Sequence, residues 1–259
     1  AVQGSLNVTI IQTHLAWENP IENRSHFDTL LKSLKDTHLV VLPEMFTTGF
    51  TMNAEQASEI SEGETLAWLQ QWAKRINAAI TGSVAVNENG NYYNRLYFVY
   101  PDGSFKTYDK KHLFTLANEH HTYNAGKERL IVEYLGWKIC PLVCYDLRFP
   151  VWARNTEDYD ALIYVANWPK IRTHAWDTLL KARAIENISY CIGVNRIGLD
   201  GNGYEYVGHS AVYNTLGELV SSKELETDLL QTVTLEKSHL NKTRSHLKFL
   251  QDRDAFTLK

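Results

Sequence analysis

The chain has 259 residues, of which 44% are hydrophobic and 22% charged, the composition of an ordinary soluble globular protein. Its formal net charge of -4, with no basic run longer than Lys110-Lys111, argues against a nucleic-acid partner. No apolar stretch approaches the ~18 residues of a membrane span. Residues 1–7 also lack the pattern of a signal peptide. We therefore expect no membrane contact and no nucleic-acid contact.

Short β-rich runs alternate with amphipathic segments along the chain. Helices are predicted where apolar residues recur on one face, at residues 27–34 and 66–76, and from Thr173, the expected N-cap, to Asn187. Several strands are apolar throughout, which indicates burial on both faces. No linker divides the chain, so residues 1–259 are predicted to form one domain. In chain order the predicted strands are Leu6–Gln12, Leu39–Leu42, Ala79–Val86, Tyr93–Tyr100, Leu130–Tyr134, Trp137–Cys144, Ala161–Ala166, Tyr190–Asn195, Tyr206–Asn214 and Leu229–Leu235.

The odd number of cysteines (Cys140, Cys144 and Cys191) and the absence of a signal pattern indicate reduced thiols in a cytoplasm. Cys140 and Cys144 lie in one predicted strand. Four steps along a strand separate two Cα atoms by ~13 Å, whereas a disulfide needs ~4.4–6.8 Å. The strand prediction therefore excludes a disulfide between them.

The sequence becomes polar beyond Glu236, although Phe249, Leu250 and Phe256 keep some apolar character. A tail of this kind packs back on its own sheet or docks on a second subunit. The sequence is compatible with both arrangements.

Three polar residues lie at or just beyond predicted strand ends, where α/β proteins bind ligands. Glu44 follows a strand that ends at Pro43, Cys144 ends another strand, and Lys110 lies in a polar segment after a predicted hairpin turn. Taken singly, each has an ordinary explanation, because most Glu and Lys are solvated and most buried Cys pack as small apolar residues. Spacing and composition alone indicate an α/β enzyme with a thiol near a base.

The segments around these three residues resemble the signature segments of the nitrilase superfamily, in the family's order and at its usual separations. The resemblance continues through residues 182–187, 195–198 and 208–210, so it covers essentially the whole chain. The three segments are Leu42-Pro-Glu-Met-Phe46, Tyr108-Asp-Lys-Lys-His-Leu-Phe114 and Val143-Cys-Tyr-Asp-Leu-Arg-Phe149.

The resemblance implies a four-layer α-β-β-α sandwich of the α/β class, with Glu44, Lys110 and Cys144 as a catalytic triad. A second family glutamate matches Glu119, for which an exposed loop residue is the ordinary alternative. Within the superfamily the fullest match is to omega-amidases, which hydrolyse 2-oxoglutaramate and 2-oxosuccinamate to the 2-oxo diacid and ammonia. The segments that carry this match are Asn118-Glu119, residues 141–150 and residues 164–169.

The chemistry of amide hydrolysis assigns a role to each of these residues. Cys144 attacks the amide carbon and forms a thioester, and Glu44 serves as the base. Lys110 favours the thiolate and, with the backbone N–H of Tyr145, stabilises the oxyanion. Glu119 is expected to orient Lys110. No cofactor is expected for thiol hydrolysis, and the resemblance implies at least a homodimer that associates through helices on one face.

The expected substrate, a small amide that carries a carboxylate, needs a cationic anchor in the pocket. Arg172 is the candidate anchor, with Trp168 and Phe114 as walls. A surface charge and ordinary core packing are the alternatives for these three residues. Arg148 is close to Cys144 in the sequence, but we expect it to pair with a carboxylate inside the protein.

Other kinds of site fit the sequence less well. His112, Glu119, His120 and His121 form a cluster, but no HExxH or CxxC pattern is present, and adjacent histidines do not easily face one metal ion. The chain has no G-x-S-x-G elbow and no GxxxxGK[ST] phosphate loop. A catalytically inactive binding protein on the same scaffold stays as an alternative, as do sibling activities such as nitrilase, N-carbamoyl amidohydrolase or another aliphatic amidase.

Overall fold

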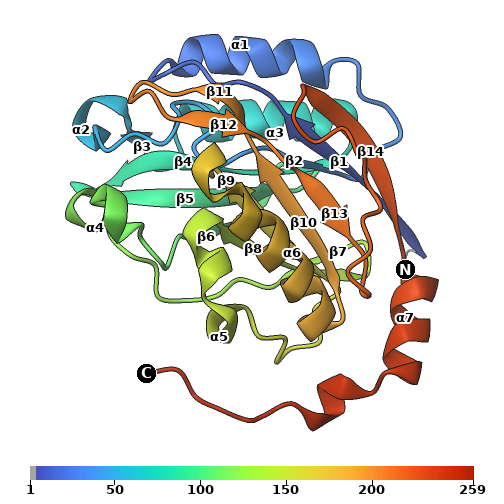
Figure 1. The fold of residues 1–259 in the computed structure, drawn as a ribbon. Coiled ribbons are helices and arrows are strands. Elements are labelled where there is room, and N and C mark those ends of the chain that lie inside the picture. The colour runs from blue at the N-terminus through green and yellow to red at the C-terminus, as the bar shows by residue number, and fades with distance from the viewer. Residues whose placement is uncertain (1–3) are drawn as a thin grey trace.

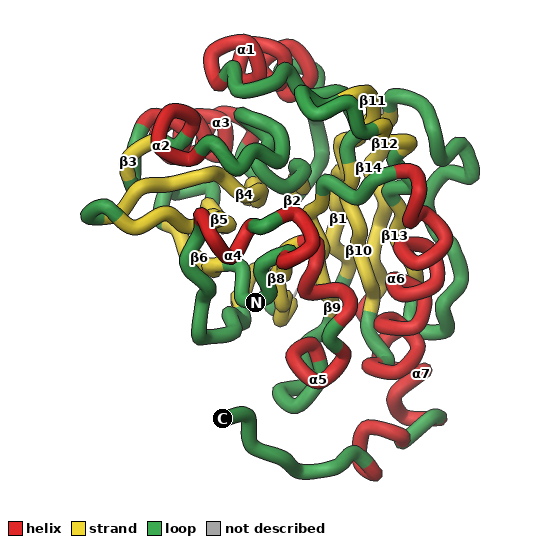
Figure 2. The backbone as a smooth tube through the Cα atoms, turned by 60° about the vertical axis from the view of Figure 1, so that its left-hand side comes forward, coloured by secondary structure: helices red, strands yellow, loops and turns green. Residues whose placement is uncertain are grey.

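Two β-sheets lie face to face at the centre of the protein, in a computed structural model that describes residues 4–259. Helices α1 (Pro20–Leu31) and α3 (Glu64–Ile76) cover the outer face of one sheet, and α6 (Thr173–Asn187) covers the other (Figure 1). The turned view of Figure 2 separates α1 and α3 on one side from α6 on the other. The architecture is the predicted four-layer α-β-β-α sandwich.

The first sheet has seven strands and is mixed. It runs in the order β14 (Leu229–Glu236), β1 (Ser5–Gln12), β2 (Leu39–Val41), β4 (Ala79–Glu88), β5 (Asn91–Val99) and β6 (Phe105–Asp109), with the short β3 (Glu59–Ile60) paired to β4. The pairs β1–β2 and β2–β4 are parallel, whereas β14 joins β1 antiparallel, with Val233 opposite Val8.

The second sheet has five strands, in the order β13 (Ala211–Tyr213), β10 (Tyr190–Asn195), β9 (Ala161–Ala166), β8 (Trp137–Val143) and β7 (Val132–Tyr134). Its centre, β8–β9–β10, is parallel, and every residue of β9 and β10 is buried, as their apolar sequences predict. The inner faces of both sheets share one core, to which Val8 and Leu39 contribute from the first sheet and Ile139 and Ile163 from the second. Each such side chain contributes about 1.5–3 kcal/mol by burial.

The helices begin and end at residues that suit those positions. The side chain of Asn19 accepts the N–H of Glu22 at 3.1 Å, and Pro20 follows as the first residue of α1. At the end of α3, Asn77 adopts the left-handed conformation with a φ of 51°. The remaining helices are α2 (Ala54–Ala57), α4 (Glu119–Thr122), α5 (Pro150–Ala153) and α7 (Lys237–His246), with 3₁₀ turns at Thr115–Ala117, Cys144–Arg148, Lys170–Arg172 and Phe249–Asp252.

The predicted strand Tyr206–Asn214 is wrong as a single element. Its first part forms β12 (Glu205–Val207), which pairs with β11 (Ile197–Leu199) in a separate two-stranded ribbon, and its second part is β13. The chain turns between them, because Gly208 and His209 have φ angles of 81° and 61°. A Cβ atom on Gly208 would lie 2.2 Å from the side chain of Gln12, so a glycine is required there.

Thr173 is not the N-cap of α6. It is the first residue of the helix, and Arg172 occupies the cap position. The hydroxyl of Thr173 donates instead to the carbonyl of Lys170 at 2.8 Å. The 3₁₀ turn at Lys170–Arg172 leads directly into the helix and turns the hydroxyl back toward that carbonyl.

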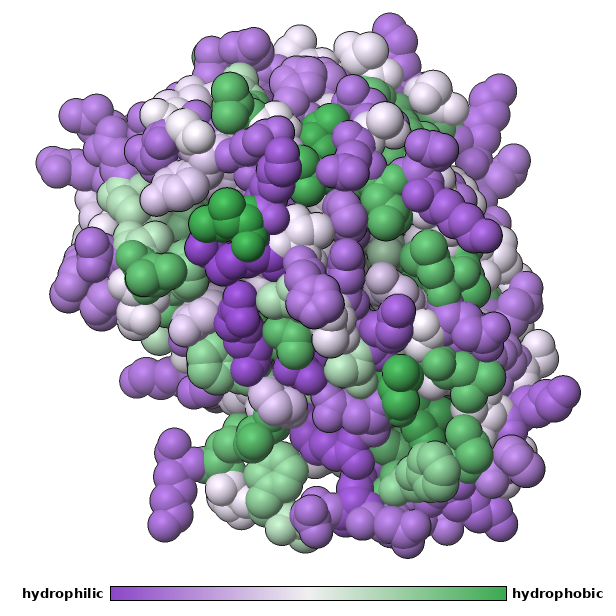
Figure 3. All heavy atoms as spheres, viewed as in Figure 1, coloured by the Kyte–Doolittle hydropathy of each residue, from purple (hydrophilic) through white to green (hydrophobic). Residues whose placement is uncertain are grey.

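The polar segment after Glu236 packs on its own chain as α7. Lys237 forms an ion pair with Asp160 at 2.8 Å, and the Arg244 guanidinium donates to the carbonyl of Ile188 at 2.9 Å. Beyond α7 the chain leaves the body of the protein (Figure 1), and Phe249 there is 60% exposed. Apolar side chains gather at the lower edge of the same view in Figure 3, over the end of α6 and along this C-terminal segment.

Two predictions from composition can be compared directly with the structure. Cys140, Cys144 and Cys191 are all free thiols, so the exclusion of a disulfide is confirmed. Within residues 4–259, no helix combines the length and the apolar character of a bilayer span.

Candidate active site

Four segments of the chain meet at one end of the two sheets. Glu44 comes shortly after β2, Lys110 directly after β6, Cys144 after β8 and Asn167 after β9. Because β8 and β9 are parallel neighbours, their carboxyl ends lie at the same edge, which brings Cys144 next to Asn167. The thiol of Cys144 lies 3.7 Å from the carbonyl oxygen of Asn167, to which it donates. The facing sheet supplies Glu44 and Lys110, so the site lies between the sheets.

The ammonium of Lys110 lies between two carboxylates, and none of the three side chains is exposed. Its Nζ atom is 2.9 Å from Oε2 of Glu44 and 2.8 Å from Oε1 of Glu119. Burial lowers the pKa of Lys110, but the charges of Glu119 and Glu44 raise it by more, so the ammonium stays protonated. In the part of the chain that the structure describes, two of its three N–H bonds go to these carboxylates, which leaves the third for a ligand.

Cys144 is held in a backbone conformation that side chains rarely adopt. Its φ is 45°, in the left-handed region, at the first residue of the 3₁₀ turn Cys144–Arg148. Such strain persists where the surrounding structure enforces it, and it is common at functional sites. Burial and the charge of Glu44 raise the pKa of the thiol well above its ordinary value, while Lys110 lowers it. In the absence of a ligand the sulfur is therefore a protonated thiol, and its reaction needs a base.

Glu44 is placed to be that base. Burial raises the pKa of this carboxyl, the Lys110 ammonium opposes the shift, and Glu119 adds to it. A carboxyl with a pKa nearer to neutrality transfers protons in both directions more readily. Oε1 of Glu44 also accepts the backbone N–H of Asn167 at 3.1 Å, which fixes its orientation beside the thiol.

Glu119 is a buried site residue and not an exposed loop residue. It begins α4, and its Oε1 also accepts the backbone N–H of Phe114 at 2.6 Å. Asn94, in β5, was missed by the sequence reasoning. Its side-chain amide donates to Glu44 at 2.8 Å and to Glu119 at 3.2 Å, so it holds both carboxylates around Lys110.

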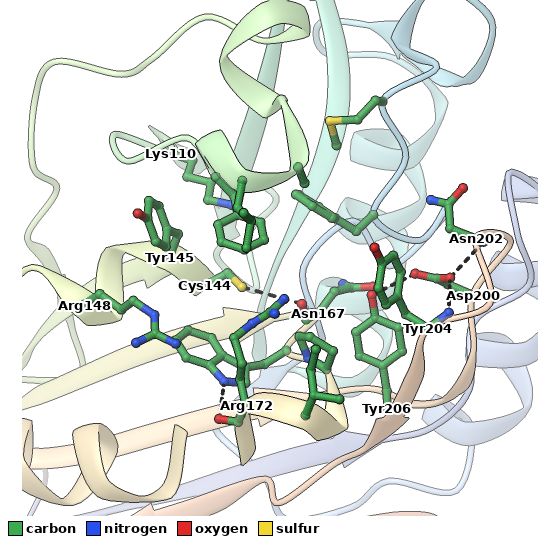
Figure 4. A pocket seen from close by; sticks show the side chains of 18 residues that line it. Lys110, Cys144, Tyr145, Arg148, Asn167, Arg172, Asp200, Asn202, Tyr204 and Tyr206 are labelled. Carbon is green, nitrogen blue, oxygen red and sulfur yellow. Dashed lines mark hydrogen bonds between the residues drawn. The ribbon is translucent and has the colours of Figure 1, made fainter. Parts of the chain in front are cut away.

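A cavity of about 420 Å³ opens above the thiol, a size typical of small-molecule sites. Six of the eight predicted site residues line it, and the other two, Glu44 and Glu119, lie behind the Lys110 ammonium. Figure 4 shows the thiol and the Lys110 nitrogen directed into the same space. The six that line the cavity are Lys110, Phe114, Cys144, Tyr145, Trp168 and Arg172.

Two arginines in the cavity wall lie over aromatic rings. The Arg148 guanidinium is 4.9 Å from the centre of the Trp168 ring, and that of Arg172 is 5.3 Å from the centre of the Phe114 ring. Among residues 4–259 neither guanidinium has a carboxylate partner or a hydrogen-bond acceptor. The expectation that Arg148 pairs with a carboxylate inside the protein is therefore wrong. Both cations face the cavity, where an anion can reach them (Figure 4).

The opposite wall comes from the ribbon β11–β12, which the sequence reasoning did not connect with the site. Asp200, the acidic residue of this ribbon that lines the cavity, accepts the hydroxyl of Tyr206 at 2.8 Å and two backbone N–H groups of its own turn. This carboxylate already has its hydrogen-bond partners, in contrast to the two guanidinium groups on the other side (Figure 4).

The residues considered as a metal cluster have separate surroundings. Glu119 contacts Lys110, and the His112 ring lies 2.8 Å from the carboxylate of the buried Asp146. His120 and His121 are exposed, with their ring centres 3.9 Å apart. Their positions follow from the short helix α4, whose later residues turn outward.

A four-layer α-β-β-α sandwich with a cysteine, a lysine and two glutamates at one cavity is the arrangement of a nitrilase-type hydrolase. The family model of the carbon–nitrogen hydrolases matches residues 7–245. The chain is 47% identical to "Omega-amidase YafV" of Yersinia enterocolitica, over 98% of this chain and 99% of the relative. It is 33% identical to "2-oxoglutaramate amidase" of Bacillus subtilis, over 89% and 92% of the two chains.

A solved structure also places the chain in this family. XC1258 of Xanthomonas campestris, a CN-hydrolase superfamily protein with an arsenic adduct in its active site, superposes with a TM-score of 0.97. The two chains are 43% identical, and the match covers 99% of this chain and 100% of that one. The chain therefore belongs to the carbon–nitrogen hydrolase family of the nitrilase superfamily. The predicted fold is confirmed, and so is the predicted enzyme class, a hydrolase of non-peptide carbon–nitrogen bonds.

Proposed function

We propose that the protein is an omega-amidase that hydrolyses the terminal amide of a 2-oxo acid, such as 2-oxoglutaramate or 2-oxosuccinamate, to the 2-oxo diacid and ammonia. The observation that carries this proposal is the cavity itself, with a thiol and an ammonium at its floor and two guanidinium groups without carboxylate partners in its wall. The names of the full-length relatives support the same activity.

The first half of the reaction forms a thioester. Glu44 removes the proton from the Cys144 thiol as the sulfur attacks the amide carbon. The free N–H of the Lys110 ammonium and the backbone N–H of Tyr145 donate to the oxyanion, each worth about 2.7–4 kcal/mol in the transition state. Glu44 then gives its proton to the amide nitrogen, which leaves as ammonia when the carbon–nitrogen bond breaks.

The second half restores the enzyme. Water takes the place of ammonia, and Glu44 removes its proton while the oxygen attacks the thioester carbon. The carbon–sulfur bond breaks, the acid product leaves, and the proton returns from Glu44 to the sulfur. Throughout, Glu119 and Asn94 act as positioning residues, because they hold Lys110 and Glu44 and do not touch the substrate.

The substrate carboxylate binds in the wall. Arg172 is its main anchor, and Arg148 is a second cation within the same cavity. A guanidinium donates two parallel N–H bonds to a carboxylate, and these charge-assisted bonds are stronger than neutral ones. The rings of Phe114 and Trp168 keep the two guanidinium groups in place from behind.

A panel of substrates tests the proposal. Ammonia release is measured with 2-oxoglutaramate, 2-oxosuccinamate, glutamine, an aliphatic nitrile and an N-carbamoyl amino acid. We expect the highest kcat/KM with a 2-oxo acid amide, because the wall attracts a carboxylate and repels the ammonium of glutamine. A higher kcat/KM with the nitrile or the carbamoyl compound would assign a sibling activity.

The location and the oligomeric state form a further part of the proposal. Three free thiols are consistent with the reducing cytoplasm. Exposed apolar residues, among them Ile185 of α6 and Phe249 and Phe256 of the C-terminal segment, favour a homodimer that covers them. Analytical ultracentrifugation tests the oligomeric state. We expect the wild type to sediment as a dimer and Phe249→Ser to associate more weakly. A wild-type protein that stays monomeric at all concentrations would exclude the homodimer.

A further inference from the structure

We propose that Asp146 is a positioning residue that fixes the distance between the Lys110 ammonium and the Cys144 thiol. The inference rests on the proposed roles of these two residues and assigns a function to a buried carboxylate outside the catalytic set. Asp146 is 0% exposed and lies in the same 3₁₀ turn as Cys144.

The two oxygens of Asp146 connect the segments that carry the reacting groups. Oδ1 accepts the backbone N–H of His112, two residues after Lys110, at 3.0 Å. Oδ2 accepts the backbone N–H of Val143, the residue before Cys144, also at 3.0 Å. One rigid carboxylate group therefore spans the two segments, which come from different sheets.

Side chains around Asp146 keep this carboxylate in one orientation. The hydroxyl of Tyr108 donates to Oδ2 at 2.7 Å, and the ring of His112 contacts Oδ1 at 2.8 Å. The His112 ring stacks on Phe149 with the ring centres 3.9 Å apart. Trp152 donates in turn to the hydroxyl of Tyr108 at 3.0 Å. Residues 108–112 and 143–152 thus form one network around the carboxylate.

An asparagine in place of Asp146 cannot make both of these backbone contacts. Each oxygen of Asp146 faces one fixed backbone N–H, so an asparagine must direct its own NH₂ group at one of them. Two donors then face each other in a buried place, and the contact to His112 or to Val143 is lost. The strained φ of 45° at Cys144 loses part of its support.

The test is Asp146→Asn. We expect kcat for ammonia release to fall by about 100-fold, the effect of misplacing reacting groups by about 1 Å, while KM stays close to the wild-type value. The rate at which iodoacetamide alkylates Cys144, followed by mass spectrometry, should fall with kcat. This second readout needs no substrate, so it tests Asp146 even if the wild-type enzyme proves inactive on 2-oxo acid amides.

Asp160→Asn is the matched control. Asp160 is also buried and also joins two segments, since its Oδ2 accepts the backbone N–H of Lys138 at 2.8 Å and pairs with Lys237 at 2.8 Å. We expect it to lower Tm and to leave kcat and alkylation unchanged. If Asp146→Asn does the same, Asp146 is a purely structural residue and the inference is overturned.

Tyr108→Phe keeps the proposal testable if Asp146→Asn does not fold. It removes one hydroxyl donor from the carboxylate and keeps the ring. We expect a loss of about 10-fold in kcat, with KM unchanged. Wild-type kcat and a wild-type alkylation rate in this variant would contradict the proposal.

Discussion

The positive charges at the floor of the cavity and in its wall differ in their surroundings. At the floor, Lys110 lies 2.8–2.9 Å from two carboxylates, and all three groups are fully buried. In the wall, Arg148 and Arg172 lie over aromatic rings, and within the described residues no carboxylate accompanies either guanidinium.

We infer from this difference that the floor serves the chemical step and the wall serves substrate binding. A balanced ion cluster stays rigid without a ligand, so its dipoles are already oriented when charge develops on the substrate. A cation without a partner is instead free to attract an anion and to hold it. We therefore expect changes at the floor to lower kcat and changes in the wall to raise KM.

Among changes at the floor, removal of the sulfur should lower kcat the most. We expect Cys144→Ala to lose at least about 1000-fold in kcat with every amide, because Lys110, which the described residues also place at the floor, is protonated and cannot replace the thiol. Its wall is intact, so the diacid product should bind as in the wild type when measured by calorimetry. Substantial turnover by this variant would show that the sulfur is not the nucleophile.

Replacement of the base should give the next largest effect. Glu44→Gln keeps the size of the side chain but cannot take a proton, and we expect kcat to fall by about 100- to 10,000-fold. The loss is measured by ammonia release at saturating substrate. Wild-type kcat in this variant would assign the base to another group.

The pH profile sharpens the same point. Burial raises the pKa of Glu44, and only the ionised carboxylate acts as a base. kcat/KM in the wild type should therefore fall as the pH is lowered through this raised pKa, at a pH above the ordinary 4.5 of a glutamate. An acid limb at or below 4.5 would mean that Glu44 does not control it.

The wall should respond through KM. We expect Arg172→Ala or Arg148→Ala to raise KM for 2-oxoglutaramate by about 10- to 100-fold, the loss of one or two charge-assisted bonds. The kcat/KM for an uncharged aliphatic amide should stay the same. Lys170→Ala is the control, because this nearby cation pairs with Glu205 at 3.4 Å outside the cavity. An equal loss with charged and uncharged amides would contradict the separation of floor and wall.

The smallest effect is expected at Asn94, which touches the two carboxylates but not the substrate. Asn94→Ala removes two donors, at 2.8 and 3.2 Å, and should lower kcat by about 10-fold with little change in KM. Steady-state kinetics measures both. If kcat does not change, Lys110 alone is sufficient to hold the two carboxylates.

Much of the fold could be predicted because the pattern of apolar residues within each segment indicates its secondary structure and burial. β9 is apolar at every position and β10 at every position before Asn195, and burial on both faces follows from that pattern alone. The run that became β12 and β13 gave a false single strand, because β-favouring residues lie on both sides of Gly208 and His209, and only their positive φ angles reveal the turn.

The site was less predictable from the residues alone. Glu44, Lys110, Cys144 and Glu119 were identified by family resemblance, since each has an ordinary explanation when taken singly. Asn94 gives no local signal, as its partner Glu44 is 50 positions away in the sequence. Arg148 looks the same in the sequence whether or not a carboxylate lies beside it, so its role depends on three-dimensional contacts.

The central claim, a thioester on Cys144, is tested most directly by turnover in the presence of hydroxylamine. Hydroxylamine attacks thioesters, so the wild-type enzyme should convert 2-oxoglutaramate partly to the hydroxamate, at the expense of the acid and in step with ammonia release. Steady release of ammonia without any hydroxamate, at concentrations of hydroxylamine that enter the cavity, would contradict the account.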